Sequence, residues 1–317
     1  MMLLNAPVRS LRMLDLQRRA GAEEVFLGLQ PPPATGMSLD SLPVIRDGQP
    51  TQVGSVSMLT ALIREAHQHG MRANFCADAP VVPAAVLPAW LDHVRTAVDA
   101  GADAIVVGSL GAATRAGTVV SGTTCTLTAG SMMAVAAPPL IDLLTRQLGV
   151  RRIAVPQHLT LDELRTVRGQ VEVELEVHVQ TGSGWDCTRC SLPDQPGVGL
   201  ACRAGYRTDA GWVDAGAGPG LLDGGLDCAL CDLPALMQLG VDVVTIAGRE
   251  SPNLRQNAKV TQIYRRALDG LRAGRTMPEI IADIDRVELS WQMAWIPRLC
   301  DQRRCRFRDS PISAAFV

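Results

Sequence analysis

Five of the nine cysteines of this 317-residue chain fall within the stretch from residue 187 to residue 231. Two pairs, Cys187 with Cys190 and Cys228 with Cys231, each enclose two residues, and Cys202 lies between the pairs. This spacing lets two sulfurs turn onto one ion or cluster, which is why it recurs in metal sites. It predicts a metal or iron–sulfur site, with chance clustering or disulfides as the alternative, and it does not choose between zinc and iron.

A second group of reactive side chains lies just before the cysteines, in the sequence VEVELEVHV of residues 171–179. Successive side chains on a strand face opposite ways, so Glu172, Glu174, Glu176 and His178 share one face. In a barrel this row would point inward. Glu176 and His178 would then lie nearest the end where the C-termini of the strands meet, which we call the mouth and where such barrels keep their active sites. An edge strand with a solvated acidic face is the alternative.

Three more candidates follow apolar strands. His158 comes after RRIAV, and a simple surface histidine is the alternative for it. Arg249 ends VDVVTIAGR, where its guanidinium could bind a substrate carboxylate through two parallel hydrogen bonds or form a structural ion pair. Asp78 follows MRANFC, although loop aspartates often only cap turns.

The remaining four cysteines carry weaker signals. Cys76 and Cys125 lie within or beside expected strands, and this placement is typical of small buried apolar residues. Cys300 and Cys305 belong to the arginine-rich sequence LCDQRRCRF, which fits a surface tail as well as a second site.

Apolar segments with alternating strand and helix spacing must position these residues. We expect strands at 23–30, 71–76, 103–109, 118–124, 151–156, 171–179 and 241–249, and helices at 10–22, 57–70, 87–102, 131–149, 160–169, 233–240, 253–274 and 278–295. This alternation favours an α/β fold: a (β/α) barrel-like parallel sheet, complete or slightly irregular, with a cysteine-rich insertion after a late strand. A doubly wound open sheet is the alternative, but no GxGxxG follows the first strand to support a dinucleotide fold.

Composition sets the outer limits. With 47% hydrophobic and 20% charged side chains, we expect one domain over 1–317, with a cysteine-rich segment at 182–231 and a C-terminal helix and tail at 276–317. The first residues make a poor signal peptide and no membrane span, so we expect a cytoplasmic protein, whose thiols stay reduced. A net charge of -2 and 3% aromatic residues make a nucleic-acid partner an unfavoured expectation.

Several segments together resemble peptidase family U32, the collagenase-like peptidases. They include AGAEEVFLGLQ, GADAIVVGSLG, LGVRRIAVPQHLTLDEL, VEVELEVHV, CRAGY and LPALMQLGVDVVTIAGR, and they run from about residue 3 to about residue 275. The members that this chain resembles best are oxygen-independent hydroxylation proteins. These carry a four-iron cluster on four cysteines and act on ubiquinone precursors or RNA bases, with prephenate as the oxygen donor.

The resemblance assigns the cluster ligands by position. Cys190 and Cys202 match the second and third cluster cysteines of the family, and Cys228 matches the fourth, with Cys231 as a substitute for it. The first cysteine of the family stands earlier in the loop, and Cys187 replaces it here. The resemblance therefore implies a [4Fe-4S] cluster on Cys187, Cys190, Cys202 and Cys228, with zinc as the alternative.

The resemblance also implies catalytic roles. Arg249 would hold a donor carboxylate, and Glu176, which matches a family glutamate, would move protons together with His158 or His178. The chain departs from the family pattern at Ala247, which replaces an acid, and at Gln157 and His158, which replace an Arg-Glu pair.

The function implied is iron–sulfur-dependent hydroxylation of a small aromatic or prenylated aromatic precursor, with this chain as one subunit of a heteromer beside a related partner. A peptidase is the alternative by family name, although the chain has neither HExxH nor GxSxG. RNA-base hydroxylation and an accessory zinc or iron–sulfur subunit without its own turnover stay open as well.

Overall fold

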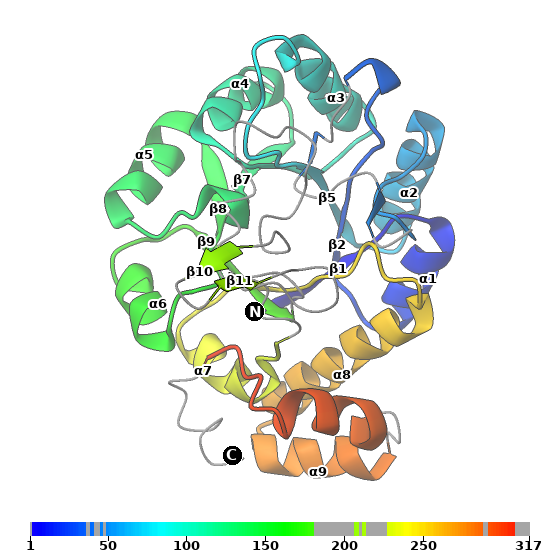
Figure 1. The fold of residues 1–317 in the computed structure, drawn as a ribbon, viewed down its shortest axis with the longest axis vertical. Coiled ribbons are helices and arrows are strands. Elements are labelled where there is room, and N and C mark those ends of the chain that lie inside the picture. Colours follow the sequence, from blue (N-terminus) through cyan, green and yellow to red (C-terminus); the bar gives the residue numbers. More distant parts are fainter. Residues whose placement is uncertain are drawn as a thin grey trace.

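Parallel strands close into a barrel in the order β1-β12-β9-β8-β7-β6-β5-β2. The computed structural model describes residues 2–35, 39–40, 45–46, 49–180, 206–208, 211–213, 227–287 and 291–307. The barrel strands are β1 (Leu3–Pro7), β2 (Glu24–Leu27), β5 (Arg72–Ala77), β6 (Ala104–Val107), β7 (Thr126–Ala129), β8 (Val150–Ala154), β9 (Glu174–Gln180) and β12 (Val243–Ile246). The expected (β/α) barrel is confirmed, and it is complete (Figure 1).

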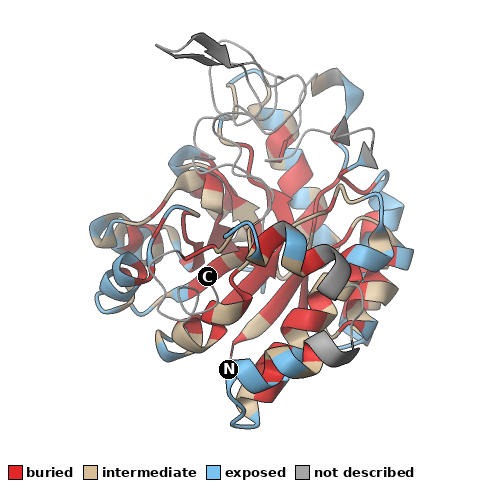
Figure 2. Cartoon of the chain, turned by 60° about the horizontal axis from the view of Figure 1, so that its bottom comes forward, coloured by how far each residue is buried: buried red, intermediate tan, exposed pale blue. Residues whose placement is uncertain are grey.

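Helices surround the strands in Figure 1. They are α1 (Leu11–Arg19), α2 (Val56–Gln68), α3 (Leu87–Asp99), α4 (Leu110–Val120), α5 (Pro138–Leu148), α6 (Leu161–Arg168), α7 (Leu233–Gln238) and α8 (Leu254–Arg272). Side-chain caps start several of them; Thr160 and Glu163 form a reciprocal capping box at α6, as the sequence TLDEL suggests. The helices bury their apolar faces against the outer face of the barrel, which makes the red centre of Figure 2.

Strand alternation decides which side chains enter the barrel. In β9, Leu175, Val177 and Val179 have no exposed surface and belong to the core between the strands and the helices. Glu176 and His178 alternate with them and therefore face the interior. The predicted division of VEVELEVHV into an apolar and an acidic face holds for this strand.

Two of the barrel strands were not predicted correctly. The strand expected at 118–124 is wrong, because α4 continues to Val120 and the strand is β7. Small residues such as Ala112 and Ala116 pack the helix against the barrel, and the side chain of Ser109 accepts a hydrogen bond from the backbone of Ala112 at its start. β1 was not predicted, because the polar Asn5 interrupts its short apolar run.

The C-terminal region forms two helices in place of the single helix expected at 278–295. These are α9 (Met277–Val287) and η6 (Trp291–Cys300), which has π-type hydrogen bonding and contains Pro297. The rest of the described structure consists of the short turns η1 (Pro33–Thr35), η2 (Ser131–Met133) and η5 (Leu230–Asp232) and the two-stranded pairs β3 (Ile45–Arg46) with β4 (Gln49–Pro50) and β10 (Tyr206–Thr208) with β11 (Gly211–Val213). Among the described residues, no helix has the length and apolar character to cross a membrane.

Candidate functional site

An ion-paired network fills the middle of the barrel. Arg152 of β8 donates from Nη1 to Oε2 of Glu24, 2.6 Å away, and from Nη2 to Oε1 of Glu24, 3.0 Å away. Burial alone would raise the pKa of Glu24, but the Arg152 guanidinium outweighs it and the pKa is lowered. Asn74 of β5 adds a hydrogen bond to Glu24 of 3.1 Å. Glu24 is therefore held as a buried, paired carboxylate.

Glu176 belongs to this network. One of its carboxylate oxygens lies 3.4 Å from Nη1 of Arg152, and the other accepts a hydrogen bond of 2.7 Å from Oγ1 of Thr245. Asn5 donates in turn to Thr245. Glu176 is only 7% exposed, so it faces the barrel interior and the solvated edge-strand alternative does not apply to it. Its proposed catalytic role is a separate matter and stays a prediction.

A buried ion pair lies at the mouth. Nη1 of Arg249 is 2.7 Å from Oδ2 of Asp40, and both side chains are almost fully buried. The guanidinium carbon of Arg249 lies 5.6 Å from the centre of the Phe26 ring. Arg9 donates hydrogen bonds to the backbone oxygens of Arg249 and Ser251, which fixes the end of β12.

Gly28 makes room for this ion pair. A Cβ atom at Gly28 would lie 2.3 Å from Oδ2 of Asp40 and 2.6 Å from Nη1 of Arg249. Any side chain larger than hydrogen would therefore displace one of the two partners.

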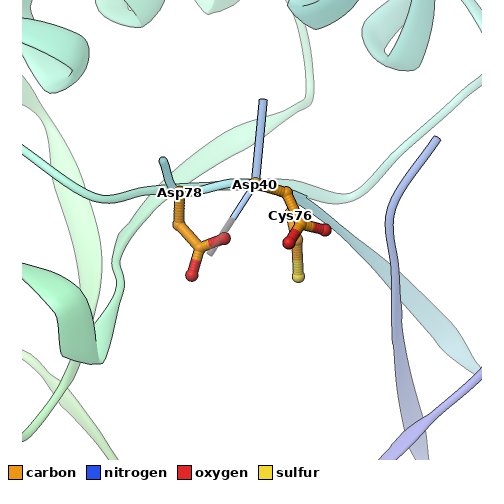
Figure 3. Close-up of side chains that lie close together, drawn as sticks. All are labelled: Asp40, Cys76 and Asp78. Atoms are coloured by element: carbon orange, nitrogen blue, oxygen red, sulfur yellow. The ribbon is translucent and has the colours of Figure 1, made fainter. Parts of the chain in front are cut away.

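Cys76 and Asp78, at the end of β5, complete the group at the mouth. One donor atom from each of Asp40, Cys76 and Asp78 lies within 4.8 Å of the other two (Figure 3). Burial raises the pKa of the Cys76 thiol well above its usual value; Arg249 opposes this shift, and Asp78 adds to it. A raised pKa disfavours the thiolate, which is the nucleophilic form of cysteine. The group therefore places two carboxylates and a thiol beside the guanidinium of Arg249.

His178 follows Glu176 on the inner face of β9. Burial lowers the pKa of His178; Glu176 raises it and Arg306 lowers it further. Nδ1 of His178 is buried and has no hydrogen-bond partner among the described residues. A neutral imidazole with a free ring nitrogen is suited to accept a proton from a bound molecule.

His158 lies apart from this group. It is exposed on the connection between β8 and α6. There its charge helps to lower the pKa of Glu163, after the larger effect of the hydrogen bonds from Thr160. The structure thus gathers Glu176, His178 and Arg249 toward the mouth and leaves His158 on the surface.

A cavity of about 1040 Å³ opens at the opposite end of the barrel. Its lining includes Arg72, Thr126, Arg152 and Glu174. Arg72, Thr126 and Glu174 lie at the N-terminal ends of their strands, the end that contributes to stability rather than to catalysis in barrels of this kind. We therefore place the candidate site at the mouth.

The four-iron cluster that the resemblance implies needs four thiolates. Cys187, Cys190 and Cys202 lie outside the described residues. Cys228 is half-buried; its Sγ accepts a 3.4 Å hydrogen bond from the backbone N–H of Leu230. Its sulfur also lies 3.6 Å from the hydroxyl oxygen of the Tyr264 side chain.

The described cysteines near Cys228 include Cys231, the expected substitute ligand, together with Cys300 and Cys305 of the C-terminal segment. Burial raises the pKa of Cys228 most, and Cys231 and Cys300 raise it further. Burial raises the pKa of Cys231 to about 12, with contributions from Asp232, Cys300 and Cys305. Among the described residues, Cys231 and Cys300 therefore lie near enough to Cys228 to affect its pKa, and Cys300 and Cys305 affect that of Cys231.

Comparison with known proteins agrees with the barrel. The family model of peptidase family U32 matches residues 9–292. The chain belongs to peptidase family U32. Among curated proteins, none matches this sequence.

Two solved structures have a fold similar to that of this chain. The U32 peptidase Mk0906 is 15% identical, with a TM-score of 0.51 over 78% of this chain and 93% of that one. The dihydrodipicolinate synthase DapA-2 from Bacillus anthracis is 9% identical, with a TM-score of 0.50 over 93% of this chain and 85% of that one. At such identities the likeness extends to the barrel alone. The U32 match ends at residue 292, so Cys300 and Cys305 lie beyond the family region.

Sequence reasoning missed much of the mouth. Asp40 stands in a stretch that was expected to be an irregular loop, Asp78 had a turn cap as its simpler explanation, and Cys76 was interpreted only as a buried apolar residue, which its 6% exposure agrees with. The one available signal was Gly28, directly after the strand β2, because a glycine at the end of a barrel strand often marks a close approach.

Proposed function

We propose that this chain is an iron–sulfur-dependent, oxygen-independent hydroxylation protein that acts at the mouth on a small aromatic or prenylated aromatic precursor. The observation that carries the proposal is Arg249. Its guanidinium is buried, and its Nε has no hydrogen-bond partner among the described residues. A buried cation with an unsatisfied donor is a site for an anion, and a carboxylate fits the planar guanidinium best.

Asp40 and Phe26 prepare Arg249 for this role. Asp40 binds Nη1, and the Phe26 ring lies beside the guanidinium. The ion pair holds the side chain in one position before a ligand arrives, so little conformational entropy is lost when a carboxylate donor such as prephenate binds. The Phe26 ring also offers an apolar surface for an aromatic ligand.

In this proposal, His178 transfers the proton. Glu176 already binds Arg152 and Thr245, so we assign it the role of balancing the positive charge of Arg152 in the barrel interior. His178 is neutral and presents a ring nitrogen without a partner among the described residues, so it can take a proton from a substrate hydroxyl or carbon acid at the mouth. A bound iron–sulfur cluster, with Cys228 among its ligands, would supply one-electron chemistry.

Membership of family U32 supports an enzyme of this kind, and it supports a peptidase by family name as much. Cys76 gives a cysteine peptidase no support, because burial and the neighbouring Asp78 and Asp40 raise the pKa of its thiol. A related partner subunit stays part of the proposal, since Ala247 stands where family members carry an acid.

The first test is anaerobic purification of the full chain. The proposal predicts brown protein with iron and acid-labile sulfide in equal amounts and a broad absorption band near about 400 nm that air bleaches. Colourless protein with stoichiometric zinc would end the hydroxylase proposal, and cleavage of peptides by that preparation would establish the alternative.

A further inference from the structure

We infer that the iron–sulfur cluster of this chain is bound by Cys228, Cys231, Cys300 and Cys305, and not by Cys187, Cys190 and Cys202. The inference rests on the proposed iron–sulfur function and concerns which thiolates carry it. It places the cluster where residues 228–231 meet the C-terminal segment, residues 291–307.

Backbone hydrogen bonds bring the two cysteine pairs together. The N–H of Cys228 donates to the carbonyl of Arg304 at 3.0 Å, and the N–H of Arg306 donates to the carbonyl of Cys228 at 2.9 Å. Cys228 and Cys305 are thereby paired as in a parallel sheet. Residues 228 and 305 are therefore neighbours, although 76 residues separate them in the sequence.

Local turns place the second cysteine of each pair. The N–H of Leu230 points at Sγ of Cys228, 3.4 Å away, and η5 carries Cys231 round the same turn. On the C-terminal side, the N–H of Arg303 donates to the carbonyl of Cys300 at 3.0 Å, with Arg303 in the left-handed region at φ 54°. Each pair thus folds back on itself, as ligands to one group must.

Arginines of the C-terminal segment offset part of the negative charge of a cluster with four thiolates, whereas burial and the carboxylates of Asp232 and Asp301 raise the pKa values of Cys231 and Cys300. All four thiols are half-buried and free of disulfides. A cluster with four thiolate ligands has net negative charge, and the segment between and after Cys300 and Cys305 supplies Arg303, Arg304 and Arg306. A backbone N–H directed at sulfur, as at Cys228, further favours the ionised form of a ligand.

The spacing of the sulfurs does not match a single zinc ion. Zinc–sulfur bonds of about 2.3 Å in a tetrahedron place the sulfurs about 3.8 Å apart. In the part of the chain that the structure describes, only Asp40, Cys76 and Asp78 form a group of three donors within 4.8 Å of one another. No three of the four sulfurs lie that close, so their spacing is wider than the tetrahedral sulfur set of one zinc ion.

This position also connects the cluster to the mouth. Arg306 follows Cys305 directly, and its Nη2 donates to the carbonyl of Pro156, 3.4 Å away, just after β8. Arg306 is only 8% exposed. Binding of the cluster would therefore fix the segment that delivers Arg306 to the side of the mouth where His178 lies.

The test compares two double variants of the full chain, purified without oxygen: Cys300→Ser with Cys305→Ser, and, as matched control, Cys187→Ser with Cys190→Ser. We expect the first to lose at least about nine-tenths of the iron, the sulfide and the visible absorption, because removal of two of four ligands abolishes cluster binding. The second should keep the values of the unchanged protein. Loss in the control variant would overturn the inference, whether or not the first variant also loses iron.

A second measurement needs no variant and so does not depend on folding. The brown, unchanged protein is alkylated without oxygen before and after iron chelation, and the modified cysteines are located by mass spectrometry. We expect Cys228, Cys231, Cys300 and Cys305 to react only after chelation. Protection of Cys187, Cys190 and Cys202 in their place would overturn the inference and leave the proposed function standing, whereas unchanged protein without iron would overturn both.

Discussion

Arg152 and Glu24 join opposite sides of the barrel through two hydrogen bonds of 2.6 and 3.0 Å. Their strands, β8 and β2, are separated by three strands in one direction round the barrel and by three in the other. The pair is therefore the centre of a polar interior, where Glu176 and Asn74 also bind to it. Removing one partner of such a pair lowers the stability of the fold strongly, because the remaining charge stays buried without a counterion.

The first prediction concerns this pair. Arg152→Met should lower the free energy of unfolding by about 3–5 kcal/mol, since it leaves Glu176 without its cation and Glu24 with only the partly exposed Arg72, 3.2 Å away. The exposed neighbour Arg151 gives a matched control, and Arg151→Met should change the free energy by less than about 0.5 kcal/mol. Urea unfolding curves measure both. Equal stability of the two variants would show that the interior ion pair contributes little.

The second prediction concerns Gly28. Gly28→Ala should push Asp40 away from Arg249, because the new Cβ would meet both side chains at less than 3 Å. We expect a loss of about 1–3 kcal/mol in stability. Gly54→Ala is the control, because a Cβ there meets nothing within 4 Å. Thermal unfolding of the two variants decides, and a Gly28→Ala protein as stable as the control would contradict the close packing at the mouth.

The third prediction concerns the pH dependence of stability. Burial lowers the pKa of His93 in α3 to about 4, against a smaller opposite effect of Asp40. In the unfolded chain His93 has a pKa near about 6.5, so between these values the unfolded state binds more protons. The stabilisation is complete above about pH 6.5 and is lost as the pH falls toward 4, by on the order of 3 kcal/mol.

His93→Phe should remove this part of the slope, and the new ring would still pack on Phe75, whose ring centre is 5.1 Å from that of His93. The control is His69→Gln at the exposed end of α2. Urea unfolding between pH 4 and pH 7 measures the slope. A slope that is the same in His93→Phe as in the unchanged protein would refute the assignment to His93.

The fourth prediction concerns donor binding. Arg249→Lys keeps the charge but loses the planar donors, so we expect the affinity for a carboxylate donor such as prephenate to fall about tenfold to a hundredfold. Arg255→Lys, in the exposed first turn of α8, should bind the donor as the unchanged protein does. Calorimetric titration of the anaerobic protein gives both affinities. Unchanged affinity in Arg249→Lys would remove Arg249 from the site.

The sequence predicts the barrel and the inward face of β9 well, because both depend on local periodicity. Glu176 and His178 could be placed for that reason. The pair of Arg249 and Asp40 could not, because it joins the end of β12 to a segment without periodicity.

The proposed site of Cys228, Cys231, Cys300 and Cys305 could not be predicted from local periodicity either. CxxC spacing is visible in the sequence, and it suggests a site for Cys228 with Cys231. The approach of Cys300 and Cys305 depends on backbone pairing between residues 228 and 305, for which no local pattern exists. Pairing between residues so far apart in the sequence forms only when the whole chain has folded.

The central claim is hydroxylation of a small aromatic precursor, and a metabolite comparison tests it most directly. A strain that lacks this chain is grown without oxygen and complemented with the unchanged chain or with Arg249→Lys. The account predicts that a precursor one oxygen atom short accumulates in the deletion strain, disappears with the unchanged chain and persists with Arg249→Lys. Unchanged levels of hydroxylated aromatic compounds in the deletion strain would contradict it.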